Sequence, residues 1–374
     1  MPKNVLLATR PIVPPWDEAS KNFAYFLGKE VRNHTLTLLT TKQKLPDLPS
    51  TVIEHPLFSS GKLNLAAKIG FFHYLMQSRD NFDVTHYLFT PTKLNTSIIK
   101  HLAKPAKGKT LQTIATLRED LYSPEELKNL LFADRLIVYT DLTKNKLQAL
   151  GFTNVTRIYP GIDLDRYQPR EKNQAVLTAY NLSPDDFLVI YPGEYTRLGA
   201  TDMLSDTFIR HFTENPTSNI KFLFACRIKN EADRKKREEV RARVRAAGLE
   251  NKILFEENHA LTDMAALYNT ADVVIFPVAD LKGKFDVPLI IIEAYACGKP
   301  VILSDMPAFQ EFTNPEICVT IPKNRGDELL RSVAYLKDNS EVRKLFGERA
   351  RTFVEKHFDL KNTAKEYEDI YSSL

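Results

Sequence analysis

The chain has 374 residues, more than a single hydrophobic core usually holds, so two domains are expected. Lys and Arg number 51 against 47 Asp and Glu, and a net charge of +4 is too weak a bias to require nucleic acid as a partner. We expect neither a signal peptide nor a membrane span, because no apolar run is long enough, and three widely spaced cysteines in apolar runs favour reduced thiols and a cytoplasmic location.

Short apolar runs typical of strands alternate with helical patterns along the whole chain, which indicates repeated βα units and parallel sheets. In the first half the expected strands are Val5–Thr9, Thr35–Thr40, Val52–His55, Val84–Phe89, Thr110–Ala115, Leu136–Tyr139 and Thr156–Tyr159. In the second half they are Leu188–Tyr191, Lys221–Ala225, Ile253–Phe255, Val273–Pro277, Val301–Ser304 and Val319–Pro322. The pattern predicts that a parallel sheet is built twice.

A polar stretch bounded by proline, Pro160–Pro169, separates the two series of strands and is typical of an interdomain linker. We place the boundary near Tyr167, which gives an N-terminal domain of residues 1–166 and a C-terminal domain of residues 167–357. The helix after the first strand has Phe23 and Leu27 on one apolar face, so its first turn lies at a strand's carboxyl end. Ligands of open α/β sheets bind at such ends.

Several segments match glycosyltransferase family 4, the large retaining group with the GT-B fold, in order and spacing. They are Asn33–Thr40, Asp83–His86, Ala133–Thr140, Tyr159–Asp163, Leu267–Pro277 and Glu293–Ile302. The chain therefore resembles this family almost from end to end. The resemblance implies an α/β GT-B fold, with two Rossmann-like doubly wound domains that face a central cleft. It also implies that a C-terminal helix, at about 358–374, packs back on the N-terminal domain.

The same resemblance implies a retaining hexosyltransferase. Its donor would be a nucleotide-diphosphate sugar linked to UDP or GDP, with no other cofactor, and its acceptor a hydroxyl of a glycan or lipid-linked sugar. The leaving phosphate would accept the proton of the acceptor, so no protein nucleophile is needed. The family works without a metal in its chemistry, and the histidines of this chain show no metal-ligand spacing, so no metal is assigned.

The donor site is expected at the segment that begins with Pro288. Pro288 fits the start of a helix that continues from Leu289, and the positive end of this helix would present the Leu289 and Ile290 amides to a diphosphate. Glu293 matches the family glutamate that accepts hydrogen bonds from the ribose hydroxyls. The alternative is a glutamate on a helix surface, but its flanking residues are apolar, and an unpaired buried charge is costly.

Four positions depart from the family pattern: Ala115, Glu194, Leu198 and Phe285. Beside Phe285, either Asp286 reaches the sugar hydroxyls or this contact is absent. Gly193 is kept near the donor, while Glu194 and Leu198 replace two cations. Arg197 is the remaining cation, and its forked guanidinium suits a diphosphate, although a solvated loop arginine is the alternative.

In the N-terminal domain, Ala19 and Ser20 stand where the family has glycines near the diphosphate. Trp16 either stacks on a sugar face or caps the helix. We assign sugar or acceptor contacts to Trp16 and to three further polar residues. These residues are Lys21, Thr116 and Arg118.

Two of three surface features allow more than one interpretation. The apolar helix within Leu63–Met76 is better explained by core packing than by lipid docking, and the basic stretch Lys100–Lys109 by a solvated connection. A peripheral contact with the inner membrane face stays open. The charged run Lys229–Arg245 is typical of a solvated surface helix.

Two other functions compete with the transferase. A catalytically weakened nucleotide-sugar-binding or scaffold protein would explain the four departures, and another GT-B enzyme, such as a sugar-nucleotide epimerase or a phosphorylase, would share the fold. The sequence does not determine the sugar, base, acceptor or oligomeric state.

Overall fold

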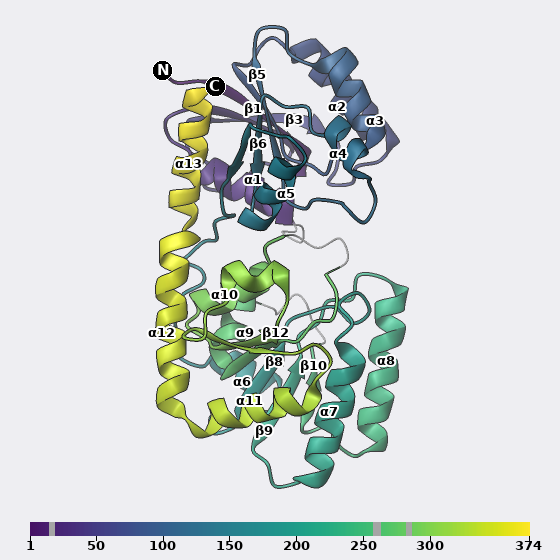
Figure 1. Ribbon diagram of the computed structural model, residues 1–374, viewed down its shortest axis with the longest axis vertical. Coiled ribbons are helices and arrows are strands. Elements are labelled where there is room, and N and C mark those ends of the chain that lie inside the picture. The colour runs from purple at the N-terminus through teal and green to yellow at the C-terminus, as the bar shows by residue number, and fades with distance from the viewer. Residues whose placement is uncertain (15–18, 257–262, 282–285) are drawn as a thin grey trace. The chain divides into compact units, whose positions relative to one another are not determined.

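The computed structural model describes residues 1–14, 19–256, 263–281 and 286–374 (Figure 1). The chain divides into two compact units, and each is built on a parallel sheet of its own. The first unit comprises Met1–Asp163, Phe285–Val287 and His357–Leu374, and the second comprises Leu164–Lys284 and Pro288–Lys356. Both are α/β units with the parallel sheets that the alternating sequence pattern predicts.

The first unit contains a seven-stranded sheet in the order β3-β2-β1-β4-β5-β6-β7, and every pairing is parallel. Its strands are β1 (Asn4–Ile12), β2 (Thr35–Thr41), β3 (Val52–Phe58), β4 (Val84–Tyr87), β5 (Lys109–Ile114), β6 (Arg135–Val138) and β7 (Val155–Arg157). The strand order reverses between β1 and β4, so the carboxyl ends of these two strands flank a topological switch point.

Helices cover this sheet, as Figure 1 shows. They are α1 (Ala19–Glu30), α2 (Leu65–Ser78), α3 (Lys93–Ile98), the π-helical turn η1 (Ile99–Ala103), α4 (Pro124–Leu130), α5 (Asp141–Ala149) and α13 (Leu360–Ser373). Helix α4 begins with a capping box, in which the Ser123 hydroxyl accepts from the Glu126 amide and the Glu126 carboxylate accepts from the Ser123 amide. Apolar Phe23, Leu27 and Val31 of the α1 region are buried, as expected from their spacing.

The C-terminal helix α13 packs on α1 and completes the core of the first unit. Buried His86 of β4 lies within hydrogen-bonding distance of the Tyr371 hydroxyl (2.9 Å from Nδ1) and of the Thr113 hydroxyl (2.7 Å from Nε2). The Tyr367 hydroxyl lies 3.1 Å from the same Thr113 oxygen. Burial lowers the pKa of His86 to about 3, so the imidazole is neutral at physiological pH and the network carries no buried charge.

The second unit contains a six-stranded parallel sheet in the order β10-β9-β8-β11-β12-β13. Its strands are β8 (Phe187–Tyr191), β9 (Ile220–Phe224), β10 (Ile253–Phe255), β11 (Val273–Phe276), β12 (Val301–Ser304) and β13 (Cys318–Ile321). Its helical segments are α6 (Gln174–Ala179), α7 (Thr201–Glu214), α8 (Glu231–Ala246), α9 (Met264–Thr270), α10 (Leu289–Ala296), η2 (Pro307–Phe312), α11 (Gly326–Asp338) and α12 (Ser340–His357). Here the strand order reverses between β8 and β11. The loops after β8 and β11 therefore flank a topological switch point, and the loop after β9 lies next to them.

Helix α10 follows β11 and is almost entirely apolar, and most of its side chains are buried. It ends in a Schellman motif, because the Gly298 amide donates to the Tyr295 carbonyl (2.9 Å), the Lys299 amide donates to the Ala294 carbonyl (3.0 Å), and Gly298 has φ +67°. Gly347 of α12 lies so close that an added Cβ would come 2.1 Å from the Gly298 carbonyl oxygen. This contact fixes the carboxyl end of α10.

Within the described ranges, no helix has the length and apolar character needed to cross a bilayer.

Candidate functional site

Glu293 lies on α10, and its carboxylate is enclosed by aromatic hydroxyls. The Tyr268 hydroxyl of α9 donates a hydrogen bond to Glu293 Oε2 at 3.1 Å. Burial raises the pKa of Glu293 to about 7, while hydrogen bonds from Tyr268 and Tyr167 and the positive charges of Arg166 and Arg227 pull it down. Glu293 is therefore a partly exposed carboxylate with an aromatic hydroxyl as partner, unlike a solvated glutamate on a helix surface.

Two arginines lie close enough to act on the Glu293 carboxylate. Arg166 stacks over the Tyr167 ring at 5.3 Å and pairs with Asp263 at 3.6 Å. Arg227 follows β9, and its backbone pairs with that of Glu194 in an isolated parallel bridge. The second unit thus holds cations around its one predicted ribose-binding carboxylate.

The loop after β8 carries a buried acidic residue, Glu194, whose side chain is only 4% exposed. Arg197 binds it through both guanidinium arms, with Nε and Nη2 each 2.6 Å from a carboxylate oxygen. Lys229, from the loop after β9, lies 3.0 Å from Glu194 Oε1. Arg197, the predicted diphosphate cation, therefore has a carboxylate partner of its own, and its side chain stays 30% exposed.

Gly193 has a packing role that the sequence did not reveal. A Cβ at this position would lie 2.3 Å from the ring of buried Tyr191, so only glycine lets the Tyr191 ring fold back under the loop. The same loop contacts the segment after β11, since the Ala279 amide donates to the Leu198 carbonyl at 3.0 Å. The three loops after β8, β9 and β11 are thereby joined.

The amino end of α10 begins at Pro288, and no side chain caps it in the described part of the chain. Pro288 is buried, whereas Leu289 and Ile290 are partly exposed. The first acceptor within the helix is the Pro288 carbonyl, which accepts from the Ile291 amide at 2.9 Å. The Leu289 and Ile290 amides therefore precede the first hydrogen bond of the helix. Their geometry suits the anion-binding role that the sequence assigns to them.

Asp286 clusters with the first unit. The Thr143 hydroxyl of α5 donates to its Oδ2 at 2.5 Å, and its own amide donates to the Ala115 carbonyl at 3.2 Å. Burial raises the pKa of Asp286 to about 6, against the hydrogen bonds from Thr143 and the Leu117 backbone. Asp286, predicted to reach sugar hydroxyls, therefore lies beside Ala115, one of the positions that depart from the family pattern.

The remaining candidates of the first unit lie near strand ends. Ala19 and Ser20 open α1, and Lys21 is buried with only 8% exposure. Thr116 is half-buried after β5, and Arg118 forms a two-armed ion pair with Asp120 at 2.7 and 2.8 Å. Trp16 and Phe285 lie outside the described residues.

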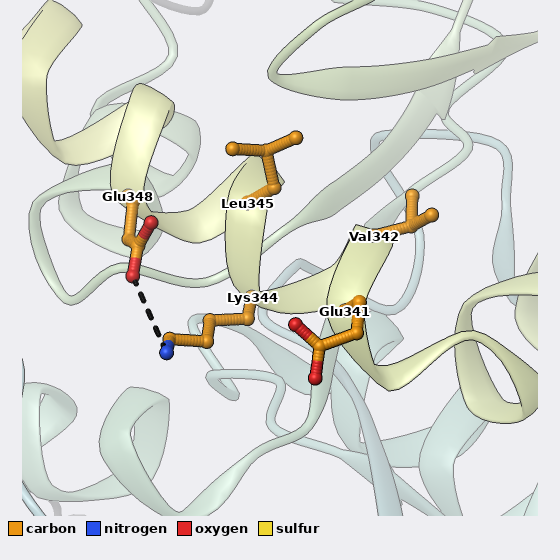
Figure 2. A pocket seen from close by; sticks show the side chains of 5 residues that line it. All are labelled: Glu341, Val342, Lys344, Leu345 and Glu348. Carbon is orange, nitrogen blue, oxygen red and sulfur yellow. Dashed lines mark ion pairs between the residues drawn. The ribbon is translucent and has the colours of Figure 1, made fainter.

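The pocket drawn in Figure 2 contains none of these residues. It is a depression of about 280 Å³ on α12, lined by Glu341, Val342, Lys344, Leu345 and Glu348. Two of these lining residues, Lys344 and Glu348, form an exposed ion pair at 3.9 Å. Among the described residues, no group of His, Cys, Asp and Glu side chains is arranged to hold a metal ion.

The sequence did not single out five residues that the structure places around the candidate site: Tyr167, Arg166, Tyr268, Arg227 and Lys229. Lys229 was grouped with the solvated helix, but it precedes α8 and pairs with buried Glu194. Its sequence signal, a cation shortly after a strand's carboxyl end, was present.

Residues 180–353 match the family model described as "Glycosyl transferases group 1". In sequence the chain is similar to D-inositol 3-phosphate glycosyltransferase 2 of Catenulispora acidiphila, with 29% identity over 46% of this chain and 40% of that protein. It is 24% identical to D-inositol 3-phosphate glycosyltransferase of Saccharomonospora viridis over 64% of this chain and 55% of that protein. The chain thus spans about half or less of the length of these relatives.

The fold is similar to that of HepE from Anabaena, solved in complex with UDP-glucose, with a TM-score of 0.74, 14% identity and full coverage of both chains. It is also similar to sucrose-phosphate synthase from Thermosynechococcus elongatus, with a TM-score of 0.72, 17% identity, and coverage of 99% of this chain and 98% of that one. These neighbours confirm the predicted GT-B fold class of two Rossmann-like units. The match to the family model of group 1 glycosyl transferases covers residues 180–353, which is less than half of the chain.

Proposed function

We propose that the protein is a retaining glycosyltransferase that moves a hexose from a UDP- or GDP-linked sugar to a hydroxyl of a glycan or lipid-linked acceptor. The observation that carries this proposal is Glu293, a carboxylate bound by the Tyr268 hydroxyl on a helix whose amino end has no side-chain cap among the described residues. A carboxylate accepts hydrogen bonds from ribose hydroxyls, and the helix amides donate hydrogen bonds to a diphosphate.

The UDP-glucose bound to HepE supports a nucleotide-sugar donor. Negative charge grows on the diphosphate as the sugar leaves, so preorganised amides and cations accelerate the reaction. We further propose that the leaving phosphate takes the proton of the acceptor and that no metal takes part.

The test is a donor panel. Purified protein is incubated with UDP- and GDP-sugars, with and without EDTA, and released nucleotide is measured. Turnover of at least one donor that EDTA leaves unchanged is expected. Binding without turnover of any donor, with a range of hydroxyl acceptors present, would refute the enzyme. The anomeric configuration of the product, measured by NMR, decides between retention and inversion.

A second candidate, a catalytically weakened protein that binds nucleotide sugars, is favoured by one contact. Arg197, the cation proposed for the diphosphate, is held by both arms to Glu194. If this pair does not open toward the donor, binding persists while transfer is slow. Product analysis in the same panel also reveals an epimerase or a phosphorylase.

A peripheral membrane contact is a separate part of the proposal, and the exposure of α2 and of the α3–η1 segment supports it. Leu65 and Ile69 of α2 are 74% and 63% exposed, and Leu94 and Leu102 are 70% and 53% exposed. Core packing, which explains buried Phe71 and Leu75, does not explain these residues. Residues 59–78 and 90–118 contain no acidic side chain of their own, although Lys93 pairs with Glu126 and Asp80 accepts the Ala106 amide, so lysines prevail on this surface.

Co-sedimentation with vesicles tests this contact. Vesicles that contain an anionic lipid should retain the protein in low salt, neutral vesicles should not, and a variant with Leu65→Ser and Ile69→Ser should lose most of the binding. Leu345→Ser on α12 is the matched control, because Leu345 is also an exposed leucine (42%) on a helix. Equal binding by the double variant and its parent would rule the surface out.

A further inference from the structure

A buried carboxylate, Glu194, lies at the carboxyl ends of the strands of the second sheet, where an anionic ligand is proposed to bind. Glu194 is 4% exposed, and a negative charge there repels a diphosphate unless cations neutralise it. Two cations do so from different loops, since Arg197 belongs to the loop after β8 and Lys229 to the loop after β9. The cluster of these three residues carries a net positive charge.

The exposed fractions show which group faces outward. The Glu194 side chain is internal at 4% exposure, Arg197 is 30% exposed, and Lys229 is 44% exposed. A buried anion therefore anchors two cations whose outer sides remain accessible. A lysine has three donors, so Lys229 keeps donors for a second anion after it binds Glu194.

The cluster is also joined to the predicted ribose carboxylate. Glu194 pairs by backbone with Arg227, and the charge of Arg227 acts on Glu293. The loop that carries Arg197 is bonded to the segment after β11 through the Leu198 carbonyl. All of these contacts lie within the second unit, at the carboxyl ends of neighbouring parallel strands.

We propose that Glu194 is a positioning residue that holds Arg197 and Lys229 in place as the cations that bind the diphosphate of the donor. Lys229, the more exposed of the two, makes the larger contribution to phosphate binding. This inference rests on the proposed function, because it assigns new residues to the same donor site. Glu194 stands where the family pattern has a cation, and in this proposal Lys229 supplies the positive charge that position 194 lacks.

Affinities for a nucleotide and its nucleoside separate phosphate contacts from base and ribose contacts. UDP, GDP, uridine, guanosine and inorganic pyrophosphate are titrated by calorimetry. Lys229→Gln should weaken the preferred nucleoside diphosphate about tenfold, as expected for a charge-assisted hydrogen bond, and leave its nucleoside unchanged. Lys235→Gln is the control, because Lys235 is an exposed lysine of the adjacent helix α8.

Glu194→Gln gives the sharper result, because a purely repulsive Glu194 and a positioning Glu194 predict opposite changes in diphosphate affinity. Removal of a negative charge near a phosphate should strengthen binding if Glu194 only repels the ligand. If Glu194 positions the cations, the diphosphate should bind several-fold more weakly, and Glu194→Asp should restore part of the affinity. Each variant's circular dichroism and melting temperature verify that it folds.

The outcomes distinguish this inference from the proposed function. If the unsubstituted protein binds neither a nucleotide nor pyrophosphate, both fail. If it binds a nucleoside diphosphate and Lys229→Gln does not weaken that binding, only the cation assignment fails. Tighter binding by Glu194→Gln would overturn the positioning role.

Discussion

Glu293 combines two demands that conflict within one side chain. A carboxylate that binds ribose hydroxyls must be ionised, yet burial on apolar α10 opposes ionisation and raises its pKa to about 7. Tyr268 offsets part of this penalty through its hydrogen bond. Such a conflict is typical of functional sites, where stability is lower than packing alone would allow.

Glu293→Gln should therefore stabilise the second unit while it weakens donor binding. Because the folded pKa lies above the ordinary value of 4.5, ionised Glu293 destabilises the fold, and this penalty grows as pH rises from about 4.5 to about 7. The variant's gain in unfolding free energy should thus rise by about 3 kcal/mol over that range and then level off. Denaturation monitored between pH 4.5 and 8 measures it.

In the parent, affinity for the preferred nucleotide should rise between pH 6 and pH 8 as Glu293 ionises. In Glu293→Gln this rise should be absent. A stability gain that does not change with pH, or an unaltered affinity in the variant, would contradict the role of Glu293.

Asp286 is a second carboxyl with a raised pKa, about 6, and its contacts lie in the first unit. Asp286→Asn should keep the contact with Thr143, because an amide oxygen also accepts, and should remove the buried charge. Stability should change little at pH 4 and increase by pH 7, since the penalty of the ionised form grows from the ordinary pKa of 3.8 to the folded pKa of about 6 and then levels off. Thermal melting at both pH values tests this, with Thr143→Val as the variant that removes the donor instead.

At the scale of single elements, α10 shows what sequence reasoning predicts well and what it does not. Its start at Pro288 was expected from the local rules for proline, and its end at Gly298 follows from those for glycine. In the described part of the chain, each strand also overlaps one of the apolar runs that predicted it. Tyr268 and Lys229 were missed because they approach Glu293 and Glu194 through tertiary contacts between loops, and no local spacing in the sequence encodes such contacts.

The contact between α12 and the end of α10 yields a prediction about this element. Gly347→Ala places a Cβ about 2.1 Å from the Gly298 carbonyl oxygen, and a backbone atom cannot rotate away. Although alanine favours a helix over glycine by about 1 kcal/mol, overpacking should destabilise the second unit by about 1–3 kcal/mol. Gly70→Ala on α2 is the matched control, since nothing lies within 4 Å of its Cβ and the substitution should stabilise slightly. Equal melting temperatures of the two variants would contradict the close contact.

At the scale of the whole molecule, the first unit is completed by the end of the chain. Its core is formed by the first 163 residues together with α13, which is separated from them in sequence by the whole second unit. The ring centroids of Phe23 in α1 and Tyr367 in α13 lie 5.6 Å apart. The Glu368 carboxylate accepts hydrogen bonds from the Arg32 and Asn33 amides. The core of the first unit therefore includes long-range contacts, whose formation costs loop entropy.

Deletion of residues 360–374 should consequently unfold the first unit and spare the second. His86 would lose the Tyr371 hydroxyl and Thr113 the Tyr367 hydroxyl, and apolar core surface would be exposed. Hydrogen exchange read by mass spectrometry should show fast exchange in residues 1–163 and near-parental protection in residues 164–356 of the truncated protein. Tyr371→Phe, which keeps the ring and removes only the hydroxyl, should destabilise the first unit by about 1–3 kcal/mol without unfolding it. Equal loss of protection in both units would show that α13 stabilises the chain as a whole, and unchanged protection in residues 1–163 would show that the first unit folds without it.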